Sequence, residues 1–458
     1  MKKSTVNRNA VCIFISAWFL SGVEGHAQSL QALYDIADRE SHQIQVSQAG
    51  LLAASEAVEQ AKTAMMPTVS LGLSGSYIGT ATLMSRGFST SGTTDVIVAG
   101  LGPQAVANGA QETPHWGNTF SAQASQVIYA GGGIQAGIRM AQLGKELAEL
   151  DVEQNRQEVR FLIAGYYLDL YKLQNQREVI DKNIDLTQQV IKAMEARREQ
   201  GTVLQNDLTR YELQLKTLEL TRGKLDDAAA IINRQLVTTL HLPDSTQVQP
   251  DRRLLDEEYA SLQTLADEQV WQQQGAESNL GIRQATVARD LAGEKVKATQ
   301  AASRPSLALV VEDNLFGPYT SDLIPVNANV NTWFVGIGVK YSLSSLWQNK
   351  HNIRQARHES HQAQERVSLA AEGVSNGIQA CYVNLLTAFR EVETQEKQVE
   401  LSDQNFSVVE NRYRNDLALL TDMLDASNTK LTADMALTDA RIQLLYNYYR
   451  LRFATSTL

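Results

Sequence analysis

Two carboxylates near the end of the chain are the first candidates for chemistry. The stretch LLTDMLDAS places Asp422 and Asp425 inside a run that is otherwise apolar and typical of a helix. Residues three apart in a helix lie on one face, so we expect the two carboxylates to lie side by side. Two interpretations stay open at this point: a helix face that meets solvent, or a site where negative charge meets something that passes by.

The rest of the sequence offers no convincing catalytic, cofactor or metal site. Gly131-Gly132-Gly133 is not followed by the Lys-Ser/Thr pair of a phosphate-binding loop. His351 and His358 are too far apart on a predicted helix for a zinc-binding pair, and a solvated face explains them. No serine or cysteine has the surroundings of a nucleophile. We therefore predict no enzyme activity, no cofactor and no metal, and we expect a partner to supply any energy for transport.

Residues 1–27 have the pattern of a secretory signal peptide. Basic residues precede the apolar run 11–20, and small residues at 25 and 27 suit cleavage before Gln28. The run is too short to cross a membrane, and no later segment has about eighteen consecutive apolar residues, so no transmembrane helix is predicted. Cleavage leaves Cys381 as the one cysteine, so no intrachain disulfide is predicted. The formal net charge of −10 disfavours nucleic acid as a partner.

The chain is an internal duplication. Asp207 matches Asp422 at an offset of 215 residues. The same offset pairs Val159 with Val374, Ile163 with Ile378, Tyr167 with Tyr382, and Leu170 with Leu385. Each half predicts a helix, a two-stranded hairpin, a long helix and a returning helix, in that order. We assign residues 28–243 to the first repeat with its hairpin at 68–129, residues 244–257 to a linker, and residues 258–458 to the second repeat with its hairpin at 306–343.

The predicted strands alternate apolar and polar residues. In the last of them one face is formed by Trp333, Val335, Ile337, Val339 and Tyr341. Such alternation is typical of barrel strands with lipid outside and water inside, although two hairpins packed on helices in a soluble fold remain an alternative. An isolated hairpin is marginal in water, so the strand edges are expected to pair with other copies of the chain.

The predicted helices are too long for a compact domain. A continuous helix over residues 130–200 would be about 100 Å long. Its apolar positions form a seam with the spacing of a coiled coil, namely Val159, Leu162, Ile163, Tyr166, Leu170 and Leu173. The segments 202–240 and 418–455 are the expected antiparallel partners of the two long helices. The predicted fold class is therefore mainly α with a small β part, built from long coiled-coil helices and four strands.

This order of elements resembles the TolC-like outer-membrane efflux proteins over essentially the whole chain after the signal peptide. The matching segments are MMPTVSLGLSGSY, VIYAGGGIQAGIRMAQ, EQGTVLQNDLTRYELQ and RYRNDLALLTDMLDA. The resemblance implies a homotrimer whose strands form a twelve-stranded barrel in the outer-membrane lipid of a Gram-negative cell. Its helices would form a periplasmic tunnel.

The function that the resemblance implies is that of the outer-membrane channel in a tripartite efflux or type I secretion system. Such a channel is a passive exit duct that a periplasmic adaptor and an inner-membrane pump open at its periplasmic tip. The alternative is an exported coiled-coil structural protein or adhesin without a pore. The sequence does not name the cargo.

The resemblance also implies roles for single residues near the periplasmic aperture. Asp422 and Asp425 match acids that line it, and in a trimer they would form a ring that favours cations. Asp207 and Tyr413 match positions that help to close it. The turns for adaptor docking fall on Gly201, Thr202, Asp416 and Leu417.

The chain departs from the family pattern at two positions of this region. Asp416 replaces a glycine of the family, although Asp tolerates turn conformations. Ala418 stands where the family has an arginine, so one closing ion pair is missing. Closure is then expected to depend on coiled-coil packing and other hydrogen bonds, or on Arg412 and Arg414.

Overall fold

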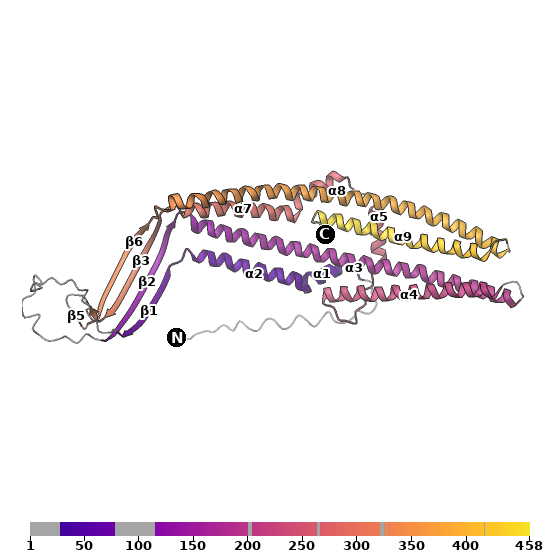
Figure 1. Ribbon diagram of the computed structural model, residues 1–458, viewed down its shortest axis with the longest axis horizontal. Helices are drawn as coiled ribbons and strands as arrows, with labels where there is room; N and C mark the ends of the chain where they lie inside the picture. Colours follow the sequence, from indigo (N-terminus) through magenta and orange to yellow (C-terminus); the bar gives the residue numbers. More distant parts are fainter. Residues whose placement is uncertain are drawn as a thin grey trace, which may run out of the picture. The chain divides into compact units, whose positions relative to one another are not determined.

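The computed structural model describes residues 28–458 except 78–114, 200–203, 263–265, 321–324, 327 and 416. The loop predicted between the first two strands lies outside the described residues. Figure 1 shows the helices and strands in chain order. They are α1 (Leu30–Glu40), α2 (His42–Thr63), β1 (Thr68–Tyr77), β2 (Trp116–Ala130), α3 (Gly133–Glu199), α4 (Gln205–Leu240), α5 (Arg252–Ser261), α6 (Glu268–Ser278), α7 (Leu280–Ala301), β3 (Ser306–Gly317), β4 (Tyr319–Thr320), β5 (Pro325–Val326), β6 (Val330–Lys340), α8 (Ser345–Arg414) and α9 (Leu420–Ala454).

These elements group into two compact units. The first unit contains residues up to 53 together with 146–287 and 364–458, and it is helical. The second contains residues 54–145 and 288–363, and it holds the strands and the helix ends that join them. The predicted fold class is confirmed, since long helices accompany a sheet of four antiparallel strands. The pair β4 and β5 is an addition, because two residues are too few to show an alternation in the sequence.

The sheet of the second unit has the order β1-β2-β3-β6, so each predicted hairpin is present and the two hairpins pair through β2 and β3. The register puts the apolar residues of all four strands on one face. Leu71 pairs with Ala122, Val311 pairs with Val335, and Leu309 pairs with Ile337. This face is open in the single chain. The strands β1 and β6 form the two edges.

One acid interrupts the apolar face. Asp313 of β3 pairs with Ala122 on one side and with Trp333 on the other, so it shares their face. Elsewhere on this face Gln126 donates from its amide to the backbone oxygen of Met65 at 2.6 Å. Among the described residues, no helix is long and apolar enough to cross a membrane.

The main core of the first unit combines both repeats. Ile163 and Leu170 of α3 are buried together with Ile378 and Leu385 of α8, the residues with which the duplication matches them. Leu162 of the predicted seam on α3 is not buried within one chain, where it is 41% exposed. The 3.6-residue helical repeat turns this position away from the stripe that packs within one chain.

The first helix of each repeat is interrupted, where the sequence predicts one continuous helix before the strands. The extended residue Ser41 separates α1 from α2, and Asn279 separates α6 from α7. We call these breaks joints. Each joint contacts the end of the returning helix of its own repeat. His42 contacts His241 in the first repeat, and the backbone nitrogen of Leu280 donates to the hydroxyl of Ser456 in the second.

Part of the predicted linker is helical, and tyrosines hold it. The carboxylate of Asp251 caps α5 by accepting hydrogen bonds from the backbone nitrogens of the second and third residues of that helix. The hydroxyl of Tyr167 donates to the backbone oxygen of Gln28 at 2.6 Å and accepts from the backbone nitrogen of Asp251 at 2.7 Å. The hydroxyl of Tyr449 donates to Glu258 at 2.6 Å. The start of the first repeat and helix α9 of the second are thereby joined to α5.

Glu258 should make stability depend on pH. Burial raises the pKa of its carboxyl above the ordinary value of 4.5, against the opposite effects of Tyr449 and Arg452. The folded state therefore binds this proton more tightly than the unfolded state, so the group lowers the free energy of unfolding as the pH rises above about 4.5. We expect Glu258→Gln to unfold at a higher temperature than the wild type at pH 7, with the difference shrinking toward pH 4.

Thermal unfolding from pH 4 to 7.5 checks this. Glu257→Gln, at an exposed neighbouring position, serves as the control and should change little. A Glu258→Gln protein less stable than the wild type at pH 7 would contradict the prediction.

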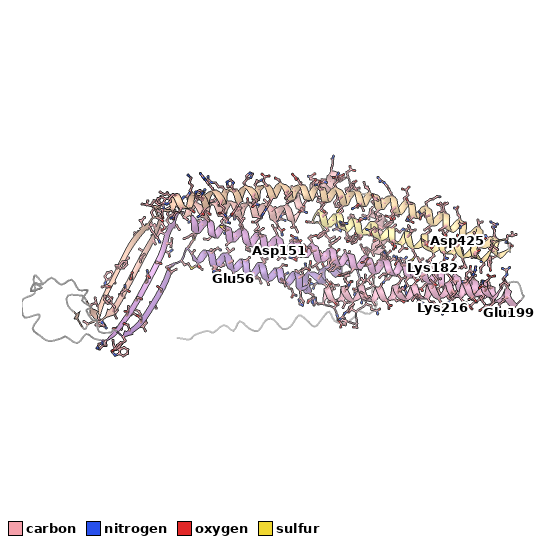
Figure 2. All side chains as sticks on the ribbon, viewed as in Figure 1. Glu56, Asp151, Lys182, Glu199, Lys216 and Asp425 are labelled. Atoms are coloured by element: carbon pink, nitrogen blue, oxygen red, sulfur yellow. The ribbon has the colours of Figure 1, made fainter. Side chains whose placement is uncertain are left out.

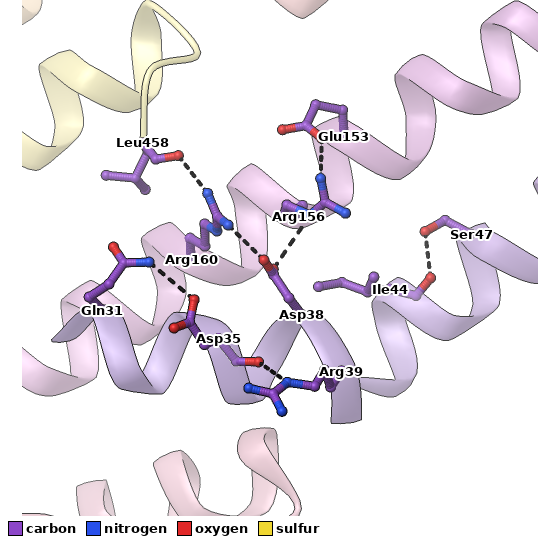
Figure 3. A network of polar contacts seen from close by, with 10 residues as sticks. All are labelled: Gln31, Asp35, Asp38, Arg39, Ile44, Ser47, Glu153, Arg156, Arg160 and Leu458. Atoms are coloured by element: carbon purple, nitrogen blue, oxygen red, sulfur yellow. Dashed lines mark hydrogen bonds and ion pairs between the residues drawn. The ribbon is translucent and has the colours of Figure 1, made fainter. Parts of the chain in front are cut away.

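A polar network joins α1 to α3 and to the end of the chain (Figure 3). Arg160 of α3 donates from Nη2 to Asp38 Oδ2 at 2.6 Å and from Nη1 to the backbone oxygen of Leu458 at 3.1 Å. Nε of Arg156 lies 3.5 Å from the other oxygen of Asp38. The side chains of Arg160 and Asp38 are 21% and 23% exposed, so water screens this pair less than a surface pair.

Candidate functional site

The candidate site lies where the two helical hairpins of the first unit reverse direction. There α3 ends at Glu199 and α4 begins at Gln205, while α8 ends at Arg414 and α9 begins at Leu420. Figure 2 shows Asp425 toward the same end of the hairpins as Glu199. Of the predicted turn residues, Gly201, Thr202 and Asp416 lie outside the described residues.

Leu417 lies among the residues that the structure describes. It belongs to a turn that Arg412 stabilises. The backbone nitrogen of Leu417 donates to the backbone oxygen of Arg412 at 2.8 Å, and the Arg412 guanidinium donates back to the oxygen of Leu417 at 3.3 Å. The Leu417 side chain is 67% exposed. Arg414 pairs instead with Glu410, one helical turn earlier. Both arginines that could replace the one missing at Ala418 thus make contacts within α8 and its turn.

Asp422 has a role that the sequence does not reveal, because it caps its own helix. Its Oδ2 accepts a hydrogen bond from the backbone nitrogen of Leu419 at 3.1 Å. Leu419 precedes α9 and has no side-chain oxygen with which to satisfy the free N–H groups there. The positive end of the helix dipole also favours a carboxylate at this position. The charge of Asp422 is therefore partly satisfied by its own helix.

Asp425 differs from Asp422 in having its charge free. It lies nearly one turn further along α9, and it is exposed. No hydrogen bond or ion pair from the described part of the chain engages its carboxylate. The helical spacing places both acids on neighbouring turns of one helix, as expected from their separation. Of the two, Asp425 is the stronger candidate for contact with a passing ion.

The two residues predicted to close the aperture lie on different hairpins. Asp207 lies in the first turn of α4, and no partner among the described residues bonds to its carboxylate. Tyr413 lies in the last turn of α8, with the Arg197 guanidinium of α3 over its ring at 5.9 Å from the centroid. A cation over an aromatic face is attractive. Within one chain Arg197 is therefore one link between Tyr413 and the first hairpin.

A small apolar cluster joins the two hairpins beside these residues. It contains side chains from all four helices, namely Met194, Leu208, Tyr211, Phe406, Leu420, Met423 and Ala426. We call it the tip cluster. It is separate from the main core of the first unit. The hydroxyl of Tyr211 is buried in it without a hydrogen-bond partner among the described residues. Burial is the main reason that the pKa of Tyr211 is raised, with Tyr413 and Glu410 adding to the effect.

Sequence reasoning did not find Arg197 or Tyr211. The duplication matches Tyr211 with Ala426, so the tyrosine is not shared, and the arginine that Arg197 shares with Arg412 does not reveal which side chain it contacts. Their contacts with Tyr413 and Glu410 depend on how the two hairpins pack, and no local spacing encodes this. In the part of the chain that the structure describes, no group of three or more potential metal ligands is gathered.

The comparisons with known proteins agree with this architecture. The chain matches the family described as outer membrane efflux protein over residues 33–240 and 271–457, which is most of both repeats. It is 21% identical to the outer membrane protein TolC of Salmonella enteritidis over 298 residues, which is 62% of this chain and 57% of TolC. It is 22% identical to the outer membrane efflux protein BepC of Brucella suis biovar 1 (strain 1330), over 98% of this chain and 90% of BepC. The chain thus spans little more than half of TolC but most of BepC.

Solved structures show the same fold at low identity. The outer membrane protein VceC from Vibrio cholerae has a TM-score of 0.71 at 14% identity, covering 93% of this chain and 96% of VceC. The structure of CusC has a TM-score of 0.73 at 14% identity, covering 93% of this chain and 91% of CusC. Because the family match extends over both repeats, the chain belongs to the outer membrane efflux protein family, with its strands assigned to the outer membrane and its helices to the periplasm.

Proposed function

We propose that three copies of the chain form a passive exit duct through the outer membrane. The observation that carries this proposal is the four-stranded sheet with an open apolar face and two edges, β1 and β6, that no other described strand pairs with. Unpaired edge strands are costly, and closure into a barrel removes them. Three copies supply twelve strands, so each β6 edge meets the β1 edge of the next copy. Membrane lipid then covers the apolar face.

The periplasmic mouth of this duct would be formed by the ends of the hairpins. With threefold symmetry, Asp422 and Asp425 supply six carboxylates around one aperture. Apolar walls of low dielectric strengthen the field of such a ring, which concentrates cations and repels anions. Because Asp207 and Tyr413 are not bonded to each other within one chain, the closing contact that we propose for Asp207 is made with a neighbouring copy.

Opening would be driven by a periplasmic adaptor and an inner-membrane pump acting on the turns near 201 and 416, with Thr202 and Leu417 among the docking residues. The size of the tip cluster supports this, because it is small and separate from the main core. Regions with few buried apolar contacts open at a lower free energy than the rest of the protein. The hairpin ends can thus separate while the core around Ile163 and Ile378 stays packed.

Ion selectivity in a planar bilayer tests the duct and the ring together. We expect the purified wild-type protein to conduct and to prefer cations, and Asp422→Asn with Asp425→Asn to reduce that preference by removing the ring charge. Asp425→Asn alone should cause the larger part of this reduction in cation preference, because the carboxylate of Asp422 already caps α9. Asn still caps a helix, so neither change should unfold the tip.

Asp244→Asn is the control, because this exposed acid pairs with Arg234 just after α4. It should leave selectivity unchanged. A wild-type protein without any conductance would refute the duct and favour a structural coiled-coil protein. Normal conductance with unchanged selectivity in the double variant would refute the ring alone.

A further inference from the structure

Two histidines far apart in the sequence meet at the joint of the first repeat. The ring of His42, the first residue of α2, lies 4.0 Å from the ring of His241 between centroids, with 63° between the ring planes. His241 is the residue that ends α4. Both side chains are exposed. Two imidazoles that contact each other can both bind one ligand that neither could hold alone.

The hydrogen bonds of Gln45 fix which nitrogen of His42 is free. The Gln45 amide donates from Nε2 to the backbone oxygen of Arg39 at 3.3 Å. Its other terminal atom, Oε1, therefore faces Nδ1 of His42 at 3.3 Å. Because an amide oxygen accepts hydrogen bonds and cannot donate them, Nδ1 carries the proton in the neutral ring. The lone pair is then on Nε2, the nitrogen that remains available to a ligand.

This arrangement is the one that metal-binding histidines use. A histidine ligand usually donates its second ring N–H to an oxygen acceptor, which fixes the tautomer and orients the ring. Gln45 supplies that acceptor for His42. The backbone fixes His241, whose φ of 55° and ψ of 33° are left-handed and whose N–H bonds to the oxygen of Thr238. The His42 ring is thus oriented by a hydrogen bond before a ligand arrives, and the His241 backbone is held where the two rings meet.

The second repeat shows that a joint of this kind does not need histidine. At the offset that matches Asp207 with Asp422, His241 corresponds to Ser456, which also has a left-handed φ of 57°. Leu280 begins α7 as His42 begins α2, and its backbone nitrogen bonds to the Ser456 hydroxyl at 3.3 Å. The side-chain amide of Asn279 donates a hydrogen bond to the backbone oxygen of Ala454 in the same joint. Packing therefore does not explain why the first joint has two imidazoles.

We propose that His42 and His241 form a binding site for a divalent transition-metal ion such as Zn²⁺, Cu²⁺ or Ni²⁺. Neutral imidazole is a good ligand for these ions, and water completes the coordination of a site with two protein ligands. The bound ion links the α1–α2 joint to the end of α4. This site does not depend on whether the chain forms a duct.

Titration of the untagged, full-length protein in detergent with Cu²⁺ or Zn²⁺ tests the site. We expect one ion per chain, nitrogen coordination in the electron paramagnetic resonance spectrum of the Cu²⁺ form, and a higher unfolding temperature with Zn²⁺. Affinity should fall at least tenfold in His42→Gln and in His241→Asn. Asn tolerates the left-handed conformation of position 241, so this variant should keep the fold.

The exposed His358 and His361 on α8 are the competing source of bound metal. A protein with His358→Gln and His361→Gln is therefore the matched control, and it should bind the ion as the wild type does. The proposal is overturned if His42→Gln and His241→Asn bind like the wild type, or if the α8 variant loses the binding instead. It is also overturned if the wild type binds no ion at all.

Discussion

Replacing Gly131 by alanine is expected to lower the free energy of unfolding of the sheet-bearing unit by about 3 kcal/mol, the largest effect that we expect for one added methyl group. Gly131 has a φ of +64°, a region that L-residues with a side chain rarely adopt. A Cβ there would lie 2.6 Å from the backbone oxygen of Ala301 and 2.8 Å from Cβ of Arg304. The turn between β2 and α3 must therefore shift away from the end of α7.

Gly137→Ala is the matched control for this change. It lies in the first turns of α3, just after that turn, and no atom outside its own helix backbone lies within 4 Å of the Cβ that alanine would add. Alanine is the better helix former by about 0.8–1 kcal/mol, so this variant should be slightly more stable than the wild type. Chemical denaturation of the two variants measures the difference. Equal stability of the two would show that the β2–α3 turn adapts to a side chain.

Replacing Arg160 by methionine is expected to lower the free energy of unfolding by about 2–3 kcal/mol. The change leaves Asp38 and the Leu458 backbone oxygen without their main hydrogen-bond donor. Arg160 also lies over the ring of Tyr34 at 5.6 Å, and that cation–π contact would be lost. Arg156 is then the remaining cation beside Asp38, at 3.5 Å. Helix α1 should be the first element to separate, which hydrogen exchange can detect.

Lys295→Met tests whether partial burial is the reason for the large effect expected of Arg160→Met. Lys295 pairs with Glu359 at 2.7 Å, but the two side chains are 53% and 35% exposed. Exposed pairs contribute at most about 1 kcal/mol, so this variant should differ little from the wild type. If Arg160→Met and Lys295→Met lower the free energy of unfolding equally, the network around Asp38 stabilises the protein no more than a surface pair does.

The sequence predicts the fold well where long periodic patterns repeat. The matching registers of Ile163 with Ile378 and of Asp207 with Asp422 reveal the duplication without any structure. The alternation in each strand likewise identifies its apolar face, because every second residue must point the same way. These features depend on local periodicity and on comparison of the two halves.

The remaining features depend on contacts between distant segments, which periodicity does not encode. The joint at Ser41 interrupts a helix whose apolar pattern looks continuous. The acids of the candidate site could be named from the sequence, but the cap that distinguishes Asp422 from Asp425 could not, because it requires the position at which α9 begins. The contact of Arg197 with Tyr413 and that of His42 with His241 arise from the packing of separate helices.

The unpaired edges of β1 and β6 have a consequence for biogenesis. An exported chain crosses an aqueous compartment while these two rows of backbone donors and acceptors still lack neighbours. The helical unit carries its own cores and can fold at that stage, whereas in the proposed trimer the sheet would gain its last hydrogen bonds when other copies arrive. In that trimer insertion and assembly would coincide, and a partner that shields the strands during transit would protect them from aggregation.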